Sequence, residues 1–170
     1  MKGELSFVEF IASMGVFISF VAYLFFLLLR YYPIYLQEME TERKRLEAYQ
    51  ISELLINDFG HPIEWELDLD SVNRFGLSDF SKNKTNFLSR TKIDSLNSFC
   101  SQPQGYEKVK EKIGAEFDFS LLMFQLPNRN ILVSCFPPPG KVKITPTNIT
   151  VRRVAALSTG GYVELVVQVW

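Results

Sequence analysis

The feature that most constrains this chain is an uncharged stretch of 20 residues, Phe10 to Leu29, which reads FIASMGVFISFVAYLFFLLL. As a helix it would be ~30 Å long, the thickness of the hydrocarbon core of a bilayer. Thirteen of its residues are Leu, Ile, Val or Phe, which favour insertion by roughly 4–8 kcal/mol as an upper bound. Because unpaired backbone groups are costly in lipid, the stretch must be helical there. The sequence therefore predicts a single membrane-spanning helix.

Two other interpretations of this stretch fit less well. A cleaved secretory signal has an apolar core of about 7–15 residues followed by small residues. Here the run is longer and ends in Arg30-Tyr31-Tyr32-Pro33. A buried helix of a soluble protein usually has a polar face, whereas this stretch offers only two serines and a glycine. We therefore expect a retained anchor.

Composition indicates one ordinary domain outside the span. The 170 residues leave ~140 beyond the anchor, enough for one domain with its own core. The 18 basic and 19 acidic residues are mixed along the chain without a basic stripe. We therefore expect no nucleic acid as a partner.

A second helical pattern follows the span. Residues 34–58 have a ragged apolar side, and the remaining positions are mostly charged. The apolar side consists of Leu36, Met39, Leu46, Tyr49, Leu54 and Leu55. Pro33 should kink or interrupt the helix near the membrane, and Gly60 should end it. We expect a stalk helix that packs on a globular head.

The head shows short helices first and strands afterwards. Helical patterns cover Thr91–Phe99, with Thr91 as a plausible cap, and Tyr106–Ile113, which Gly114 ends. Strand patterns cover Phe117–Leu126, Ile131–Phe136, Lys141–Ile144, Ile149–Leu157 and Tyr162–Trp170. The fold class is thus α+β: a long N-terminal transmembrane and stalk helix, then short helices and an antiparallel β-sheet head. The predicted divisions are residues 1–9, a signal-like segment, 10–29, the span, 30–58, the stalk, and 59–170, the head.

The first nine residues, MKGELSFVE, place a basic residue and a glycine before a serine and a glutamate. This pattern resembles the class III signal of archaeal type IV pilin-like proteins. The resemblance implies that a prepilin peptidase cuts after Gly3, that Glu4 becomes the new N-terminus, and that the helix packs with other pilin-like subunits. Ser6 matches the family pattern, whereas Glu9 lies one residue after the usual acidic position, which Val8 occupies.

Glu9 also has a meaning from physical chemistry alone. A carboxylate at the edge of a span can reach the headgroup water, which is the commoner arrangement. Alternatively it can pair with the N-terminal amine of a neighbouring subunit, as in pilin assembly. In both cases a negative charge in the first turn suits the helix dipole.

The orientation of the anchor is not decided by charge. Lys2 precedes the span and Arg30 follows it, with three further basic residues near position 44, and this count alone would place the head in the cytoplasm. The sequons at Asn83 and Asn148 indicate an extracytoplasmic head if they are glycosylated. We expect a single-pass cell-membrane protein with an extracytoplasmic head.

Cys100 and Cys135 are the only cysteines and do not form a C-x-x-C motif. They are either a disulfide on the extracytoplasmic side or two small buried hydrophobic residues. Their separation in the sequence does not distinguish these alternatives.

Signs of catalysis or of metal binding are missing from the sequence. His61 is the only histidine, which excludes a multi-histidine metal site. The acidic series Glu64, Glu66, Asp68 and Asp70 lacks the spacing of a calcium loop. We interpret it as the solvated face of an extended segment, and Trp65 as a packing residue. We expect no enzyme activity, no catalytic or metal-binding residues and no cofactor.

A second resemblance covers about two-thirds of the chain. A group of archaeal membrane-anchored proteins has a similar layout of short segments, here GHPIEW, FGLS, Lys92 with Leu96, YEKVKEKIG with DFSL, and ITVRRV with ELVVQVW. This resemblance supports the same compartment and the pilin-like interpretation.

Two functions remain in competition. The first is a structural subunit of a pilin-like or pseudopilin-like surface filament, anchored in the bilayer and assembled through its N-terminal helix. The alternative is a single-span surface binding domain that does not polymerise. The first predicts removal of residues 1–3, and the second predicts an intact N-terminus.

Overall fold

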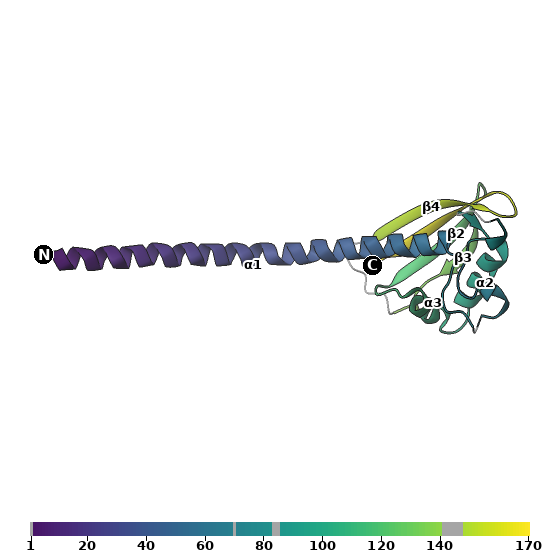
Figure 1. The fold of residues 1–170 in the computed structure, drawn as a ribbon, viewed down its shortest axis with the longest axis horizontal. Coiled ribbons are helices and arrows are strands. Elements are labelled where there is room, and N and C mark those ends of the chain that lie inside the picture. The colour runs from purple at the N-terminus through teal and green to yellow at the C-terminus, as the bar shows by residue number, and fades with distance from the viewer. Residues whose placement is uncertain (1, 70, 83–85, 141–147) are drawn as a thin grey trace. The chain divides into compact units, whose positions relative to one another are not determined.

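A computed structural model describes residues 2–69, 71–82, 86–140 and 148–170, with side chains from residue 7 onward. The chain divides into two compact units, Met1–Glu40 and Thr41–Trp170. One long helix, α1 (Lys2–Asn57), contributes to both (Figure 1). The expected α+β fold with a long N-terminal helix is confirmed.

Helix α1 is continuous through Pro33, so the proline does not interrupt it. Proline removes one backbone hydrogen bond, and the turns on both sides continue the helix. The helix ends at Asn57, and Gly60 follows with a φ of +81°, a backbone angle that suits glycine.

The buried side of the last α1 turns differs from the expected one. Leu46 and Tyr49 are 60% and 55% exposed, so placing them on the packed side was wrong. Leu55, which was also expected on the apolar side, is fully buried, and it completes a buried stripe with Lys44, Ala48 and Ile51. These residues are spaced by four, three and four positions, which places them on one helix face. A search for apolar residues alone misses the stripe, because its first residue is a lysine.

Short helices and turns connect α1 to the sheet. They are the 3₁₀ turns η1 (Trp65–Leu67) and η2 (Phe80–Lys82) and the helices α2 (Arg90–Cys100) and α3 (Gly105–Ile113). Both predicted short helices are therefore confirmed. The N-cap of α2 is Ser89 rather than Thr91, whose hydroxyl lies 2.7 Å from the Ser89 hydroxyl. Gly114 ends α3 with a φ of +76°, as expected.

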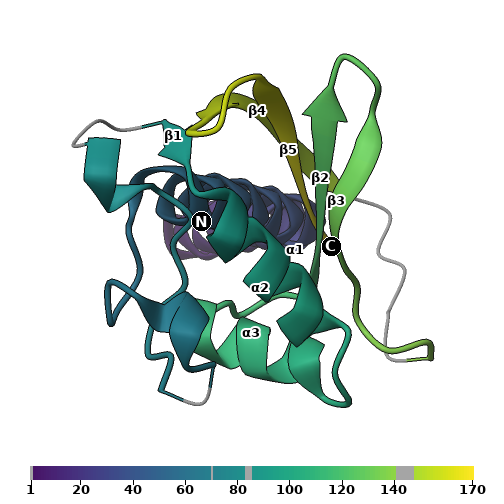
Figure 2. The same cartoon turned by 90° about the vertical axis from the view of Figure 1, so that its right-hand side faces the viewer.

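The strands form one sheet in the order β1-β4-β5-β2-β3 (Figure 2). Their bounds are Phe87–Leu88 for β1, Phe119–Leu126 for β2, Asn130–Cys135 for β3, Ile149–Leu157 for β4 and Tyr162–Val169 for β5. Strands β2 to β5 pair antiparallel, but β1 pairs parallel to β4. The sheet is therefore mixed, which corrects the expectation of a purely antiparallel one. The predicted segment Lys141–Ile144 lies outside the described residues.

The core of the second unit lies between the inner face of the sheet and the helices. Strand β5 is central, and its alternate residues Val163, Leu165 and Val167 are fully buried. The last turns of α1 share this core, as do α2, α3 and Trp65. The final seventeen residues of α1 are thus a structural part of the head.

Candidate functional site

The first unit consists of helix alone and leaves its apolar side chains uncovered. Between Phe7 and Glu40 every side chain is exposed except the half-buried Leu27. Among the described residues, α1 is the one helix that is both long enough and apolar enough to cross a membrane, judged by length and composition. None of the side chains in its most apolar window is buried. A buried core helix of this chain is thereby excluded for the apolar stretch.

The residues expected to act in processing and assembly lie on this helix. Gly3 and Glu4 have helical backbone, and their side chains are outside the described part. Glu9 is exposed, immediately before the apolar run. The other expected site residues belong to the second unit.

In the second unit, the end of α1 is closed by backbone atoms from a distant loop. The last carbonyls of a helix have no partner within it. Here the carbonyl of Leu55 accepts a hydrogen bond from the amide of Leu77 at 2.9 Å, and the carbonyl of Asp58 accepts one from the amide of Ser78 at 3.0 Å. The loop at 77–78 thus replaces the missing turn.

A buried lysine completes this closure. Lys92 on α2 is 3% exposed, and its Nζ donates to the carbonyl of Phe59 at 2.7 Å and to that of Ser78 at 3.3 Å. A cation is also favoured at the C-terminal, negative end of a helix. Lys92 therefore joins three segments that are separate in sequence.

Two glycines and a tryptophan bring these segments close enough. Trp65 is fully buried, and its Nε1 donates to the carbonyl of Gly76 at 2.9 Å. A Cβ on Gly76 would lie 2.4 Å from the carbonyl oxygen of Asp58, and a Cβ on Gly60 would lie 2.5 Å from the Trp65 ring. Only glycine allows this approach. We call this group the helix-end clasp: Gly60, Trp65, Gly76, Ser78 and Lys92.

The electrostatics of the clasp combine burial with nearby acids. Burial lowers the pKa of Lys92, and the carboxylates around it, Glu66 first and then Asp79, Asp58 and Glu64, oppose that shift. Hydrogen bonds from Ser81 lower the pKa of Asp79. The buried Ser78 hydroxyl and one Glu66 carboxylate oxygen have no hydrogen-bond partner among the described residues. The hydrogen bonds of this arrangement fasten segments of backbone together.

The acidic series around Trp65 corrects one expectation. Residues 65–67 form a 3₁₀ turn rather than an extended segment, because Trp65 turns inward to the core. Glu64 and Asp68 are exposed, and Asp70 lies outside the described residues. The packing role of Trp65 agrees with the prediction. His61 is exposed, and the described residues contain no group of three or more metal-ligating side chains.

A second polar cluster ties α3 to the start of β2. The Tyr106 hydroxyl accepts a hydrogen bond from the amide of Phe119 at 3.0 Å, and burial raises the pKa of Tyr106. Lys110 forms a salt bridge with Asp118 at 2.6 Å. Close by, the Phe117 amide donates to the carboxylate of Glu47 on α1, whose pKa is raised by burial.

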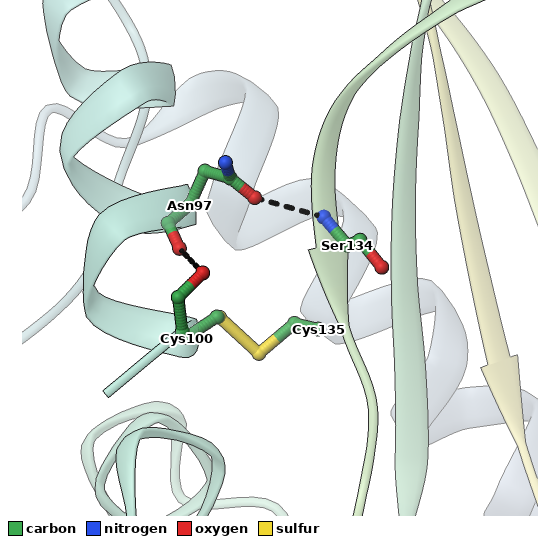
Figure 3. The surroundings of a disulfide bond; sticks show 5 residues. Asn97, Cys100, Ser134 and Cys135 are labelled. Carbon is green, nitrogen blue, oxygen red and sulfur yellow. Dashed lines mark hydrogen bonds between the residues drawn. A yellow bond between two sulfur atoms is a disulfide. The ribbon is translucent and has the colours of Figure 1, made fainter. Parts of the chain in front are cut away.

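A disulfide joins the end of α2 to strand β3 (Figure 3). The sulfur atoms of Cys100 and Cys135 are 2.09 Å apart, across a sequence separation of 35 residues. One turn earlier on α2, Asn97 Oδ1 accepts a hydrogen bond from the amide of Ser134 at 3.2 Å (Figure 3). Helix α2 therefore covers part of the β3 edge, where backbone groups would otherwise be open to another strand.

Of the two sequons, one can be placed. Asn148 is exposed immediately before β4, and the Thr150 side chain of the same sequon is exposed too. The sequon at Asn83 lies outside the described residues.

Sequence reasoning missed the roles of two lysines. Lys92, Leu96 and Phe99 follow the spacing of one helix face, as Lys44 and Ala48 do on α1, and this spacing was the available signal. Buried lysines are rare, so a hydrophobic pattern alone passes over them. Comparison with protein-family models, curated proteins and solved structures finds no match to this chain.

Proposed function

We propose that this protein is a structural subunit of a pilin-like surface filament, anchored and assembled through α1. The observation that carries the proposal is the apolar surface of α1 from Phe10 to Leu29, whose side chains are exposed within the chain apart from the half-buried Leu27. Such a surface needs lipid or another apolar helix around it. A helix inserted in a bilayer before assembly and packed among its copies afterwards meets both requirements.

The form of the helix supports packing between copies. Ala12, Gly15, Ser19 and Ala22 fall within an arc of roughly 80° at 100° per residue. Small residues on one face let helix backbones approach closely in an apolar medium. Among the described residues, a Cβ at Gly15 would meet nothing within 4 Å, so no contact among them requires a glycine there. The disulfide supports an extracytoplasmic head, since disulfides persist in oxidising compartments.

The first experiment is an intact-mass measurement of the protein extracted from membranes. We expect the chain to lack residues 1–3 and to begin at Glu4. A chain that retains Met1 to Gly3 would contradict processing as a pilin-like subunit and favour the alternative, a surface binding domain that does not polymerise.

A second experiment tests Glu9 as an assembly residue. Glu9→Ala should reduce recovery of the protein in filaments or in complexes of several subunits, whereas Ser13→Ala, a matched control one turn away, should not. Equal assembly of both variants would leave Glu9 with no role beyond reaching the headgroup water.

A further inference from the structure

The face of the sheet that points away from the core carries a row of four side chains, three of them apolar and one a glutamate. Strand register places Val154 opposite Glu164, Glu164 opposite Phe124, and Phe124 opposite Ile131. Val154 is 60% exposed and Ile131 is 62% exposed. The row thus crosses four strands and ends in an exposed apolar side chain on each side.

Two arginines, Arg129 and Arg152, flank this row. Arg129 Nη2 lies 3.1 Å from one oxygen of Glu164, and Arg152 Nη1 lies 3.8 Å from the other. The Arg129 guanidinium also lies 5.4 Å from the centre of the Phe124 ring. Two cations share one carboxylate, so the surface has one positive charge in excess. We call it the basic stripe: Phe124, Arg129, Ile131, Arg152, Val154 and Glu164.

A surface of opposite charge follows α1. Leu67 is 79% exposed, more than any other large apolar side chain described, and Ile63 is 46% exposed. Glu64 and Asp68 are exposed beside them. Trp65, between these residues, is fixed in the core, so the turn that presents them is held rigidly. We call it the acidic knob: Ile63, Glu64, Leu67 and Asp68.

The knob and the stripe lie on different sides of the head. In Figure 2 the segment that follows α1 is at the lower left, whereas the β2–β3 hairpin is at the upper right. Segments separated in projection are separated in space, so these two surfaces can meet only between two copies of the chain.

We propose that the acidic knob of one copy docks on the basic stripe of the next. Each surface combines exposed apolar side chains with charge, and the two charges are opposite, which favours this pairing over knob with knob or stripe with stripe. Contact between two different surfaces is heterologous, and a heterologous contact that does not close into a ring builds an open filament. This inference rests on the proposed function and adds a contact between heads to the contact between helices.

Crosslinking in the membrane of two variants, each with one cysteine added to the bonded pair Cys100 and Cys135, tests the pairing. The full-length chain with Leu67→Cys is co-expressed with the full-length chain carrying Val154→Cys, and a short bis-maleimide is added. We expect crosslinked dimers in the mixture and about tenfold fewer when either variant is expressed alone. Equal crosslinking in all three samples, or none in the mixture, would overturn the proposal.

Charge reversal provides the second test. Arg152→Glu alone, or Glu64→Arg alone, places like charges opposite each other, and each should lower the crosslinked fraction at least about tenfold. The two substitutions in one chain restore opposite charges and should recover most of the crosslinking. Lys108→Glu, an exposed reversal on α3, is the matched control and should leave the crosslinked fraction unchanged. A double variant as defective as the single ones refutes the charge pairing.

A crosslink within the helix separates this inference from the function on which it rests. Copies with Ser19→Cys, a substitution of similar size on the face of small residues, should crosslink to each other if the helices pack together. If the helix crosslink forms and the knob–stripe crosslink does not, this inference fails and the filament function stands. If neither forms, both fail.

Discussion

The role of Lys92 in the clasp can be tested by replacing it with methionine, which has a similar length but no charge. Lys92→Met removes a short bond to the carbonyl of Phe59 and a longer bond to that of Ser78. Hydrogen bonds to a charged group contribute ~1.5–3 kcal/mol each, and the longer one belongs at the low end. The loss is therefore about 3–4 kcal/mol.

Part of this loss is recovered, because methionine does not carry the desolvation cost of a buried ammonium group. That cost is real, since burial lowers the pKa of Lys92 despite the surrounding carboxylates. Allowing about 1–2 kcal/mol for it, the net destabilisation should be ~2 kcal/mol. The expected sign follows from the two carbonyls, which stay buried after the charge has gone.

The assay is urea unfolding of the full-length protein in detergent, followed by tryptophan fluorescence, to which the buried Trp65 and the C-terminal Trp170 contribute. Lys108→Met on α3 is the control and should stay within about 0.5 kcal/mol of the parent. If Lys92→Met is as stable as the parent, the bonds to the carbonyls only balance the desolvation cost, and the clasp does not depend on the lysine.

The pH dependence gives a second check on the same residue. The pKa of Lys92 is lower in the folded state than its ordinary value of 10.5. Between those two values the unfolded chain binds more protons, so stability rises with pH. The stability advantage of the parent over Lys92→Met should therefore grow as the pH rises toward 10.5. A constant difference across that window would contradict burial as the cause of the shift.

Three further predictions concern other parts of the second unit. Burial raises the pKa of Glu47 above 4.5 in the folded state, so the protein loses stability as the pH rises through that folded-state pKa and the carboxyl ionises. Glu47→Gln should therefore be more stable than the parent at pH 7, and this advantage should vanish below pH 4.5 in chemical denaturation. Replacing both Cys100 and Cys135 with alanine opens a loop of 35 residues, for which chain entropy gives about 4 kcal/mol; a change in unfolding free energy below about 1 kcal/mol would refute this. Gly76→Ala would drive its Cβ into the Asp58 carbonyl and should cost ~2–3 kcal/mol in the same assay, whereas Ser98→Ala on the α2 surface should be nearly neutral.

The main elements could be predicted because their signals are local. Helices α2 and α3 each have an apolar face, and Gly114 marks the end of α3. Strands β2 to β5 are rich in apolar residues, with β-branched ones most frequent in β4 and β5. The two-residue strand β1 has no such signal, because it exists only through its pairing with Ala156 and Leu157. The parallel pairing that makes the sheet mixed could therefore not be predicted from the sequence.

The clasp could not be assembled from the sequence for a related reason. GHPIEW, FGLS and Lys92 were noticed as separate segments, and their meeting depends on contacts between residues as far as 33 positions apart. Gly76 looks like an ordinary loop glycine until the Asp58 carbonyl is seen against it. Similarly, the sequence left the two cysteines open, because only the fold shows that the end of α2 lies beside β3.

The boundary of the head gives the last prediction. Sequence reasoning placed it at residue 59, but the compact unit begins at Thr41, and Ile51, Leu55 and Ile56 are almost fully buried in its core. Burying three such side chains contributes roughly 5–9 kcal/mol, comparable to the whole stability of a domain. A chain shortened to begin at Thr41 should therefore fold and unfold cooperatively, whereas one that begins at Phe59 should not. Cooperative thermal unfolding of the chain that begins at Phe59 would show that the head folds without α1. The clasp would then not be needed to fix the end of α1 to the head.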